Sequence, residues 1–426
     1  MRTYIYPERK DWQKLTKRPE LKRSALDSVV AGIIEEVRVK GDTALKKFSR
    51  EFDGITVGDF RVPESEIKAS ARKVGPELRK AIQLAASNIR KFHSSQVRKE
   101  KLVETVKGVR CWRKNIAIDK AGLYIPGGTA PLFSTVLMLA IPANVAGCKQ
   151  VILCTPPAKD GKVDPVLLYA AQVSGVKDVF RVGGAQAIAA MAYGTASIPM
   201  VDKIFGPGNQ YVTRAKQLVQ LTGTAIDMPA GPSEVLIVAN EKSRPDFIAA
   251  DLLSQAEHGI DSQVVLVTDY EPLIEEVQNE IREQLKQLPR KSIAKESLAG
   301  SFSVLLRSAE DCIDFSNMYA PEHLIIASPG ASELAEYVRN AGSVFIGQYS
   351  CESAGDYVSG TNHTLPTNGF SKSYSGVSTE SFLKKITFQE ITGPGLKRIG
   401  KAIELMAEAE QLRAHRNAVT IRLNNI

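Results

Sequence analysis

The chain contains 426 residues, of which 43% are hydrophobic and 24% are charged, and its formal net charge is +8 at pH 7. This length exceeds what one ordinary core accommodates and predicts two to three domains, at roughly 150 residues each. The basic residues alternate with acids, as in "RKEKLVETVKGVR", so the positive charge favours a solvated surface and argues against a nucleic-acid-binding protein.

Secretion and membrane insertion are not expected. The N-terminal segment "MRTYIYPERKDWQKL" lacks the apolar run of a secretory signal. The most apolar stretch, "STVLMLAIPANVAGC", is shorter than the roughly 20 residues that span a bilayer. Five scattered cysteines without a C-x-x-C pair argue against a disulfide framework and a zinc ribbon. We therefore expect a cytoplasmic protein without a membrane partner.

The predicted elements divide the chain into four regions. Residues 1–118 are charged and show helical spacing, as in "DSVVAGIIEEVRVKGDTALKKFSREFDG", and are expected to be helical and to pack partly with the second α/β domain. From residue 119 short apolar runs alternate with helix-length segments, and a second such series begins at "SEVLIVA". This alternation predicts an α/β fold with two open, mostly parallel, incomplete Rossmann-like sheets in residues 119–234 and 235–376, with helices on both faces. Residues 377–426 are expected to form a helical tail.

The segment "DLLSQAEHGIDS" places a polar side chain on the apolar face of a helix predicted to begin at Pro245. Steps of four and three residues from Ile248 and Leu252 reach Gln255, and His258 falls on nearly the same face. A buried amide without a partner costs about 1 to 3 kcal/mol, so Gln255 must be bonded to something. A satisfied core glutamine beside a surface histidine is the simpler interpretation; a pair of metal ligands is the alternative.

Two further pairs of polar residues lie in or beside predicted loops. In "APEHLIIAS", Glu322 and His323 immediately precede a strand, where adjacent side chains point to opposite sides and could serve different steps of one reaction. Asp356 and His363 lie in the loop 350–375, whose glycines permit close approach of a ligand. For each pair an ordinary loop position is the simpler interpretation.

Glycine-rich turns follow three strands of the first predicted sheet. "YIPGGTAP", "VGGAQA" and "GPGNQY" each stand where a strand gives way to a helix, and their backbone N–H groups could hold a phosphate. In the last of them Tyr211 occupies the place of the third glycine of a dinucleotide fingerprint. A nucleotide ligand is therefore plausible from these turns alone.

Taken together, eight segments resemble the histidinol dehydrogenase family. They are "GLYIPGGTAP", "VGGAQAIAA", "VDKIFGPGN", "AIDMPAGPSE", "SQAEHG", "APEHL", "GDYVSGTNHTLPT" and "EAEQLRAHRNAV". They occur in the family's order between residues 115 and 420. The resemblance implies an oxidoreductase that converts L-histidinol to L-histidine in two hydride transfers, with two NAD and one zinc ion per subunit.

The resemblance also implies roles for individual residues. The catalytic pair is Glu322 and His323. The metal ligands are Gln255, His258, Asp356 and His415. The substrate contacts are Ser233, Gln255, His258, Glu322, His323, Asp356, His363, Glu410 and His415. The NAD contacts are Tyr124, Gln186 and Asn209. The family is further expected to form a homodimer in which the partner subunit supplies His415.

The chain departs from the family's pattern at two positions. Phe133 stands where many relatives carry proline, beside a turn on the NAD side. Gln411 stands where many carry glycine. Glu410 and His415, five residues apart, would diverge by about 140° on a continuous helix, so a break between them is needed for both to face one ligand.

The mechanism that the resemblance implies uses zinc as an anchor, because zinc has no accessible second oxidation state. His323 would act as general base in both oxidations, and Glu322 would activate water between them. A cysteine thiohemiacetal at Cys148 or Cys111 is a rival route, but neither thiol has a base nearby in sequence, and both are interpreted as structural. A zinc hydrolase that uses Glu322 and His323 without NAD is the alternative function.

Overall fold

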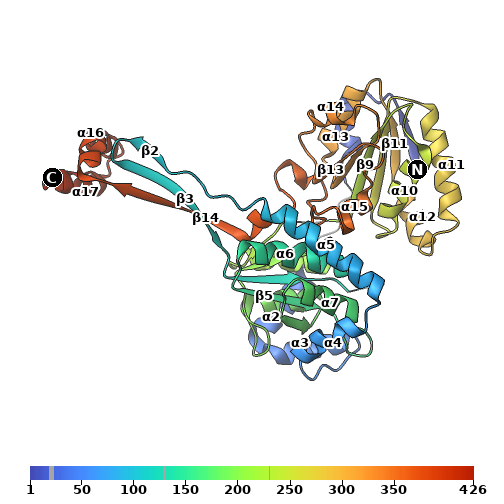
Figure 1. Cartoon of the computed structure of the whole chain (residues 1–426), viewed down its shortest axis with the longest axis horizontal. Coiled ribbons are helices and arrows are strands. Elements are labelled where there is room, and N and C mark those ends of the chain that lie inside the picture. Colours follow the sequence, from blue (N-terminus) through green and yellow to red (C-terminus); the bar gives the residue numbers. More distant parts are fainter. Residues whose placement is uncertain (19–23, 128–130, 230) are drawn as a thin grey trace.

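The computed structural model describes residues 1–18, 24–127, 131–229 and 231–426. Figure 1 shows two sheet-containing units beside each other and a long ribbon that extends away from them, with the C-terminus at its tip. Among the described residues no helix combines the length and the apolar character that crossing a membrane requires. The α/β class predicted from the alternation of strands and helices is confirmed, and the sheets of both units are wholly parallel.

The first unit is built on a five-stranded sheet with strand order β6-β5-β4-β7-β8. Its strands are β4 (Lys120–Tyr124), β5 (Gln150–Thr155), β6 (Asp178–Arg181), β7 (Lys203–Phe205) and β8 (Ala225–Ile226). The intervening helices are α6 (Phe133–Ala146), α7 (Pro165–Val173), α8 (Gly184–Tyr193) and α9 (Gln210–Gln220). The Asp164 side chain accepts from the backbone N–H of Val166, and proline follows at the first helical position, so α7 begins where its sequence specifies.

The second unit is built on a six-stranded sheet with strand order β1-β11-β10-β9-β12-β13. Its strands are β1 (Arg2–Ile5), β9 (Glu234–Ala239), β10 (Gln263–Thr268), β11 (Phe302–Leu305), β12 (His323–Ile326) and β13 (Ser343–Ile346). Its helices are α1 (Arg9–Leu15), α10 (Pro245–Ala256), α11 (Pro272–Leu285), α12 (Lys291–Ala299), α13 (Ala309–Tyr319), α14 (Ala331–Ala335) and α15 (Glu352–Tyr357). Every residue of β9 is buried, as expected for a central strand covered on both faces.

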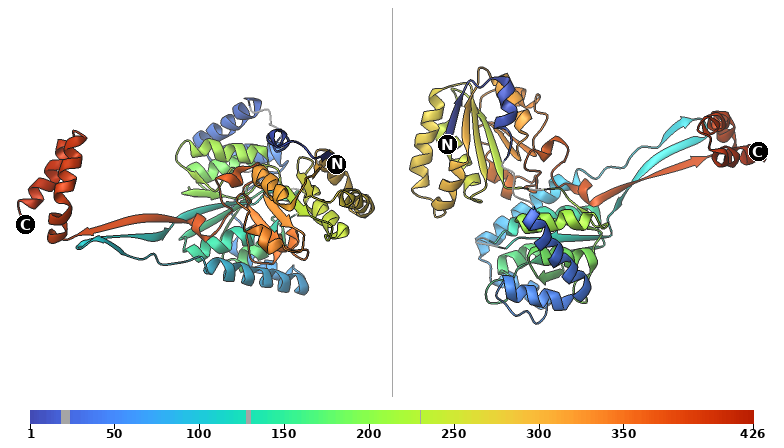
Figure 2. Two further views of the ribbon diagram at one scale, coloured as in Figure 1. Left: turned by 90° about the horizontal axis from the view of Figure 1, so that it is seen from above. Right: turned by 180° about the vertical axis from the view of Figure 1, so that it is seen from behind.

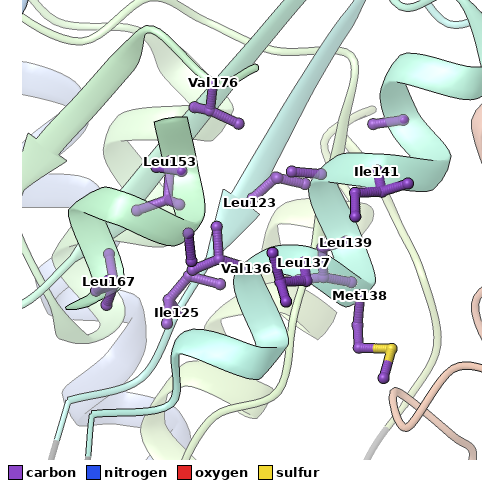
Figure 3. Close-up of a cluster of buried hydrophobic side chains, with 14 of the residues drawn as sticks. Leu123, Ile125, Val136, Leu137, Met138, Leu139, Ile141, Leu153, Leu167 and Val176 are labelled. Atoms are coloured by element: carbon purple, nitrogen blue, oxygen red, sulfur yellow. The ribbon is translucent and has the colours of Figure 1, made fainter. Parts of the chain in front are cut away.

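Each sheet separates two hydrophobic clusters. In the first unit Leu123 and Leu153 contribute to one cluster, whereas their neighbours Tyr124 and Cys154 contribute to the other. This division follows from the alternation of side chains along a strand. Figure 3 shows the first of these clusters, where side chains of α6 such as Val136 lie against Leu123 and Leu153. The rigid sheets therefore define where the connecting loops, and the polar residues on them, must lie.

The N-terminal region contains a strand as well as helices. Residues 2–5 form β1, which pairs with β11 of the second sheet, and Trp12 of α1 packs edge-on against Phe315 of α13. The helices that follow pack against the first unit. They are α2 (Ser24–Lys40), α3 (Asp42–Phe52), α4 (Glu64–Ala69), the short η1 (Ser70–Arg72) and α5 (Pro76–Ser94). The N-terminal region thus contributes to both units.

Three strands rather than helices form the projecting ribbon. They are β2 (Val103–Val106), β3 (Val109–Ala117) and β14 (Leu383–Ile391), in an antiparallel sheet with order β14-β3-β2. Trp112 stacks on Phe388 across the ribbon, with ring centroids 5.6 Å apart. Such cross-strand aromatic pairs stabilise a sheet that has no core beneath it. Because the ribbon covers no core, its charged sequence lacks the alternation of apolar and polar residues that indicates a strand. Helices α16 (Gly393–Ala409) and α17 (Arg413–Leu423) lie at the ribbon's tip (Figure 2).

Candidate active site

The polar residues gather where the two units meet. Glu234 and His323 are the first residues of β9 and β12, so both lie at the amino edge of the second sheet. Thr135 lies in the first turn of α6, which follows β4 and therefore starts at the carboxyl edge of the first sheet. His363 Nε2 lies 3.1 Å from Thr135 Oγ1. The amino edge of one sheet thus faces the carboxyl edge of the other.

Glu322 and His323 are both held by the backbone of one residue of β9, Glu234. The backbone N–H of Glu234 donates to Glu322 Oε2 at 2.9 Å, and the carbonyl oxygen of Glu234 lies 3.1 Å from His323 Nδ1. A carbonyl oxygen only accepts, so Nδ1 carries a proton and Nε2 is the nitrogen left for chemistry. Both side chains are nearly enclosed, at 6% and 3% exposure, which excludes an ordinary solvated loop.

The expectation that these two side chains point to opposite sides is wrong. Glu322 Oε2 and His323 Nδ1 lie 3.6 Å apart, because Glu322 precedes the strand and turns towards the backbone of Glu234, which His323 also contacts. Burial raises the pKa of Glu322 to about 8, and the neighbouring imidazole only partly opposes this. Burial alone would lower the pKa of His323, but Glu322 and Asp356 raise it to about 10.

A cluster of three potential metal ligands lies beside His323. Ligand atoms of His258, Glu352 and Asp356 all lie within 4.8 Å of one another. Helix α15 places both carboxylates on one face because they are four residues apart, and His258 follows the end of α10. Asp356 Oδ1 is buried without a hydrogen-bond partner among the described residues, and His323 Nε2 lies 3.7 Å from it. A buried carboxylate oxygen without a donor is what a divalent cation would satisfy.

The charge of Asp356 is suited to this role. Burial acts to raise the pKa of Asp356, but the imidazoles of His323, His363 and His258 lower it below its ordinary value. The carboxyl group is therefore ionised at neutral pH, as a metal ligand must be.

Gln255 is almost completely buried, as the helical spacing predicted, and its amide has protein partners. With the amide oriented so that Nε2 faces Glu352, this nitrogen donates to both carboxylate oxygens, at 3.0 Å for Oε2. In that orientation Oε1 accepts from the backbone N–H of Glu234 at 3.1 Å. A cation is therefore not needed to explain why the amide is buried.

Glu352 is the residue that the sequence reasoning missed. It is 1% exposed, and burial raises its pKa to about 7, while His323 acts in the opposite direction. Ser254 Oγ of α10 donates to its Oε2 at 3.0 Å. The signal in the sequence was an acid four residues before Asp356, in a stretch interpreted as a long loop but folded as α15. A helix there would have put both carboxylates on one side.

His363 connects the two units in a neutral form. Its Nδ1 lies 3.0 Å from the carbonyl oxygen of Asp356, so Nδ1 carries the proton, and Thr135 donates its hydroxyl proton to Nε2. Burial lowers the pKa of His363, which favours this neutral state. Ser233 precedes β9 at the same edge, where its carbonyl oxygen accepts from the N–H of Gln263.

The three residues expected to contact NAD lie along the carboxyl edge of the first sheet. Tyr124 ends β4, and its hydroxyl accepts from the N–H of Gly184 at 3.0 Å. Gln186 is buried in the first turn of α8. Asn209 caps α9 by accepting from two backbone N–H groups, which leaves its amide nitrogen for other partners. Residues 128–130 of the turn "YIPGGTAP" lie outside the described residues.

Comparison with known proteins identifies the family. The family model described as histidinol dehydrogenase matches residues 16–423. The chain is 55% identical to the histidinol dehydrogenase of Bacteroides thetaiotaomicron over 426 residues, which is 100% of both chains. It is 49% identical to that of Escherichia coli K12 over 415 residues, with coverage of 97% and 95%. The chain belongs to the histidinol dehydrogenase family.

The fold agrees with this assignment over the whole chain. The crystal structure of histidinol dehydrogenase from Elizabethkingia anophelis matches with a TM-score of 0.98 and 53% identity, and the match covers 100% of this chain and 98% of that chain. Membership of the histidinol dehydrogenase family favours a dehydrogenase over the zinc hydrolase considered from the sequence.

Glu410 and His415 lie far from the other candidate residues of this histidinol dehydrogenase family member. Glu410 follows α16 and His415 lies in the first turn of α17, at the tip of the ribbon, whereas His258 and Asp356 belong to the second unit (Figure 1). Gln411 adopts a φ of 59°, so the helix is broken between the two residues even though glutamine replaces glycine there. One chain alone does not bring these two residues to the cluster.

The two thiols considered for a covalent route, Cys111 and Cys148, do not lie among the residues of the candidate active site. Cys111 lies on β3 of the ribbon, and Cys148 follows α6, where burial raises its pKa to about 11. Burial also raises the pKa of Cys154 and Cys312 far above the ordinary value. A thiol that resists ionisation is a poor nucleophile, which favours the structural interpretation.

Proposed function

We propose that this chain oxidises L-histidinol to L-histidine in two successive hydride transfers to NAD. The observation that carries the proposal is the enclosed pair Glu322 and His323, with His323 Nε2 3.7 Å from Asp356 Oδ1, a buried oxygen without a hydrogen-bond partner among the described residues. A base beside a cation site suits the oxidation of an alcohol that is bound to that cation. Membership of the histidinol dehydrogenase family over nearly the full length supports the same substrate.

The donor set fits one zinc ion. His258 and Asp356 would be ligands from this chain, with the amide oxygen of Gln255 and His415 of the partner subunit as the others. Glu352 would orient Gln255 by accepting from its Nε2, as a residue behind a metal ligand commonly does. When bound, zinc would anchor the amine and imidazole nitrogens of histidinol and supply positive charge beside the reacting alcohol.

His323 is the base in both oxidations under this proposal. Its Nδ1 proton is committed to the carbonyl oxygen of Glu234, so Nε2 receives the proton of the alcohol while the hydride leaves carbon for NAD. The aldehyde then adds water, with Glu322 as the base, and gives a hydrate. Once its Nε2 has released the first proton to solvent, His323 accepts a proton from the hydrate as the hydrate loses hydride to a second NAD, which yields the carboxylic acid.

The high pKa of His323 in the ligand-free chain is compatible with this role. The carboxylates that raise it include Asp356, which would bind the cation. A divalent charge at that position lowers the pKa of nearby acids and bases, and so favours the neutral imidazole.

A homodimer would complete the site. Glu410 and His415 lie on the tip of the ribbon, and a second copy placed so that this tip reaches the cluster would supply both residues. The ribbon and its terminal helices expose large apolar side chains, which a second copy would cover. They include Ile386, Ile391, Leu405, Met406 and Leu412.

The deciding experiment measures NADH from purified protein with zinc, L-histidinol and NAD. Two NADH per histidinol are expected, with L-histidine as product. Absence of NADH from protein that contains stoichiometric zinc would overturn the proposed reaction, and release of product without NAD would favour hydrolysis. The variant His323→Asn should bind zinc normally and lose turnover, because it lacks only the proton acceptor.

A further inference from the structure

Arg18, a buried arginine of the N-terminal segment, forms an ion pair with Glu234, the residue whose backbone is bonded to Glu322 and His323. Arg18 Nε lies 2.9 Å from Glu234 Oε1, and Arg18 Nη2 lies 2.8 Å from Oε2, in a two-pronged ion pair. The two side chains are only 10% and 2% exposed. Parallel hydrogen bonds of this kind fix both direction and distance, which a single contact does not.

The remaining contacts of Arg18 leave its guanidinium little freedom. Nη1 donates to the carbonyl oxygens of Thr16 at 2.8 Å and Tyr319 at 2.7 Å. The guanidinium also lies over the ring of Tyr319, 3.3 Å from its centroid. Glu234 Oε1 accepts in addition from the backbone N–H of Asn368, in the loop that follows His363. The ion pair therefore joins the N-terminal segment, α13, β9 and this loop.

Glu234 uses its backbone for the catalytic pair and its side chain for Arg18. The N–H donates to Glu322 and the carbonyl oxygen accepts from His323, as described above. A shift of the Glu234 backbone would move both contacts and would displace the Nε2 atom that faces Asp356. The reaction therefore depends on the position of the Glu234 backbone.

Charge explains why Glu234 needs a partner. Its carboxylate is buried close to Glu322, whose pKa it helps to raise. A buried acid left without a counter-charge either takes up a proton or moves, because an unpaired buried charge is strongly unfavourable. Without Arg18, repulsion from the nearby acids would favour movement of the Glu234 side chain and backbone.

We propose that Arg18 is a positioning residue for the catalytic pair and acts through Glu234. The inference rests on the proposed roles of Glu322 and His323. It assigns to the N-terminal segment, which is distant in sequence from every candidate site residue, a part in setting the rate of both oxidations.

The test compares the metal-loaded variants Arg18→Lys, Arg18→Ala and Glu234→Gln with the native enzyme. Each is expected to lower kcat for histidinol and for histidinaldehyde by roughly 10- to 100-fold, the scale of a misplaced catalytic group, with KM and zinc content little changed. Lysine should not restore the rate, because an ammonium cannot form the two-pronged contact. Added guanidinium ion should partly restore kcat of Arg18→Ala.

Arg9→Ala is the matched control. Arg9 belongs to the same N-terminal segment and pairs with Asp314 of α13 at 2.5 Å, but this pair is exposed and does not reach Glu234. Its kcat is expected to stay at the native value. A purely structural role for Arg18 would instead give a lower melting temperature with native kcat per zinc-loaded site, and that result would overturn the inference.

The variant His323→Asn distinguishes the proposed catalytic role of His323 from the positioning role of Arg18. If it retains native turnover, the proposed role of His323 is wrong and the inference about Arg18 falls with it. If it is inactive while Arg18→Lys and Glu234→Gln keep native kcat, only the inference about Arg18 is overturned. Glu234→Gln preserves shape, so it decides the question even where Arg18→Ala does not yield folded protein.

Discussion

Thr135 and His363 form a hydrogen bond between the two sheet units, with 3.1 Å between Thr135 Oγ1 and His363 Nε2. The opposite ring nitrogen of His363 is bonded to the carbonyl oxygen of Asp356. The imidazole therefore connects the first turn of α6 with α15, on which both carboxylates of the cluster, Glu352 and Asp356, lie.

Thr135→Val should weaken this connection. Valine keeps the shape but removes the hydroxyl donor, so a buried nitrogen loses its partner at a cost of about 1 kcal/mol. We expect a melting temperature lower by about 1 to 2 °C and a raised KM for histidinol, since His363 is a proposed substrate contact. Thr135→Ser retains the donor and is the control; equal effects of serine and valine would contradict the explanation.

Glu352→Gln should weaken metal binding. The carboxylate accepts from Gln255 and lies within the cluster, so its loss should raise the dissociation constant for zinc by about 10- to 100-fold. Competition with a chromophoric chelator measures this constant directly. Glu257→Gln removes an equal charge next to His258 but outside the cluster, and an equal effect of the two substitutions would argue against a specific role for Glu352.

Gln411 tests the backbone break between α16 and α17. Its φ of 59° is unfavourable for a side chain with a Cβ, and most of all for a β-branched one. Gln411→Gly should leave stability unchanged or raise it by up to about 1 kcal/mol, whereas Gln411→Val should lower it by about 1 to 2 kcal/mol. Thermal unfolding monitored by circular dichroism distinguishes them; a valine variant as stable as the glycine variant would refute the prediction.

Asp53 offers a prediction of pH dependence remote from the site. Its Oδ2 is buried without a hydrogen-bond partner among the described residues, and burial raises its pKa. The folded chain therefore binds the proton of Asp53 more tightly than the unfolded chain does. As the pH rises from the ordinary pKa of the unfolded chain through the raised pKa of the folded chain, the contribution of Asp53 to the free energy of unfolding falls. Asp53→Asn should raise the melting temperature by about 1 to 2 °C at pH 8 and by less at pH 4.5. Glu51→Gln, at an exposed position of α3, should show no such difference.

Mixed dimers test whether the ribbon is exchanged. A heterodimer of one His323→Asn subunit and one His415→Ala subunit contains one intact site if His415 acts on the partner, and none if it acts within its own chain. We expect about half of the native activity from this heterodimer, although both parent homodimers are inactive. A heterodimer as inactive as its parents would place His415 elsewhere in the mechanism.

The elements with strong local signals were predictable. Strands and helices that alternate with a regular apolar pattern, and a helix that begins at Pro245, depend on neighbours in the chain. The ribbon was not predictable in this way, because β3 and β14 are separated by more than 260 residues. Neither strand covers a core, so neither needs the alternation of apolar and polar side chains that indicates a strand. Glu352 was missed for a related reason, since a short helix in a loop rich in small polar residues has no apolar stripe.

The sequence by itself determined the family, the α/β class and the set of polar residues available for chemistry, because motif order and local periodicity are properties of the chain. The tertiary structure alone decided which of these residues meet. It brought Glu352 and Asp356 beside His258, gave Gln255 a protein partner and set the Glu234 backbone between Arg18 and the catalytic pair. It also carried His415 away from its own site, since contacts between distant segments depend on how the sheets pack and where the ribbon leaves them.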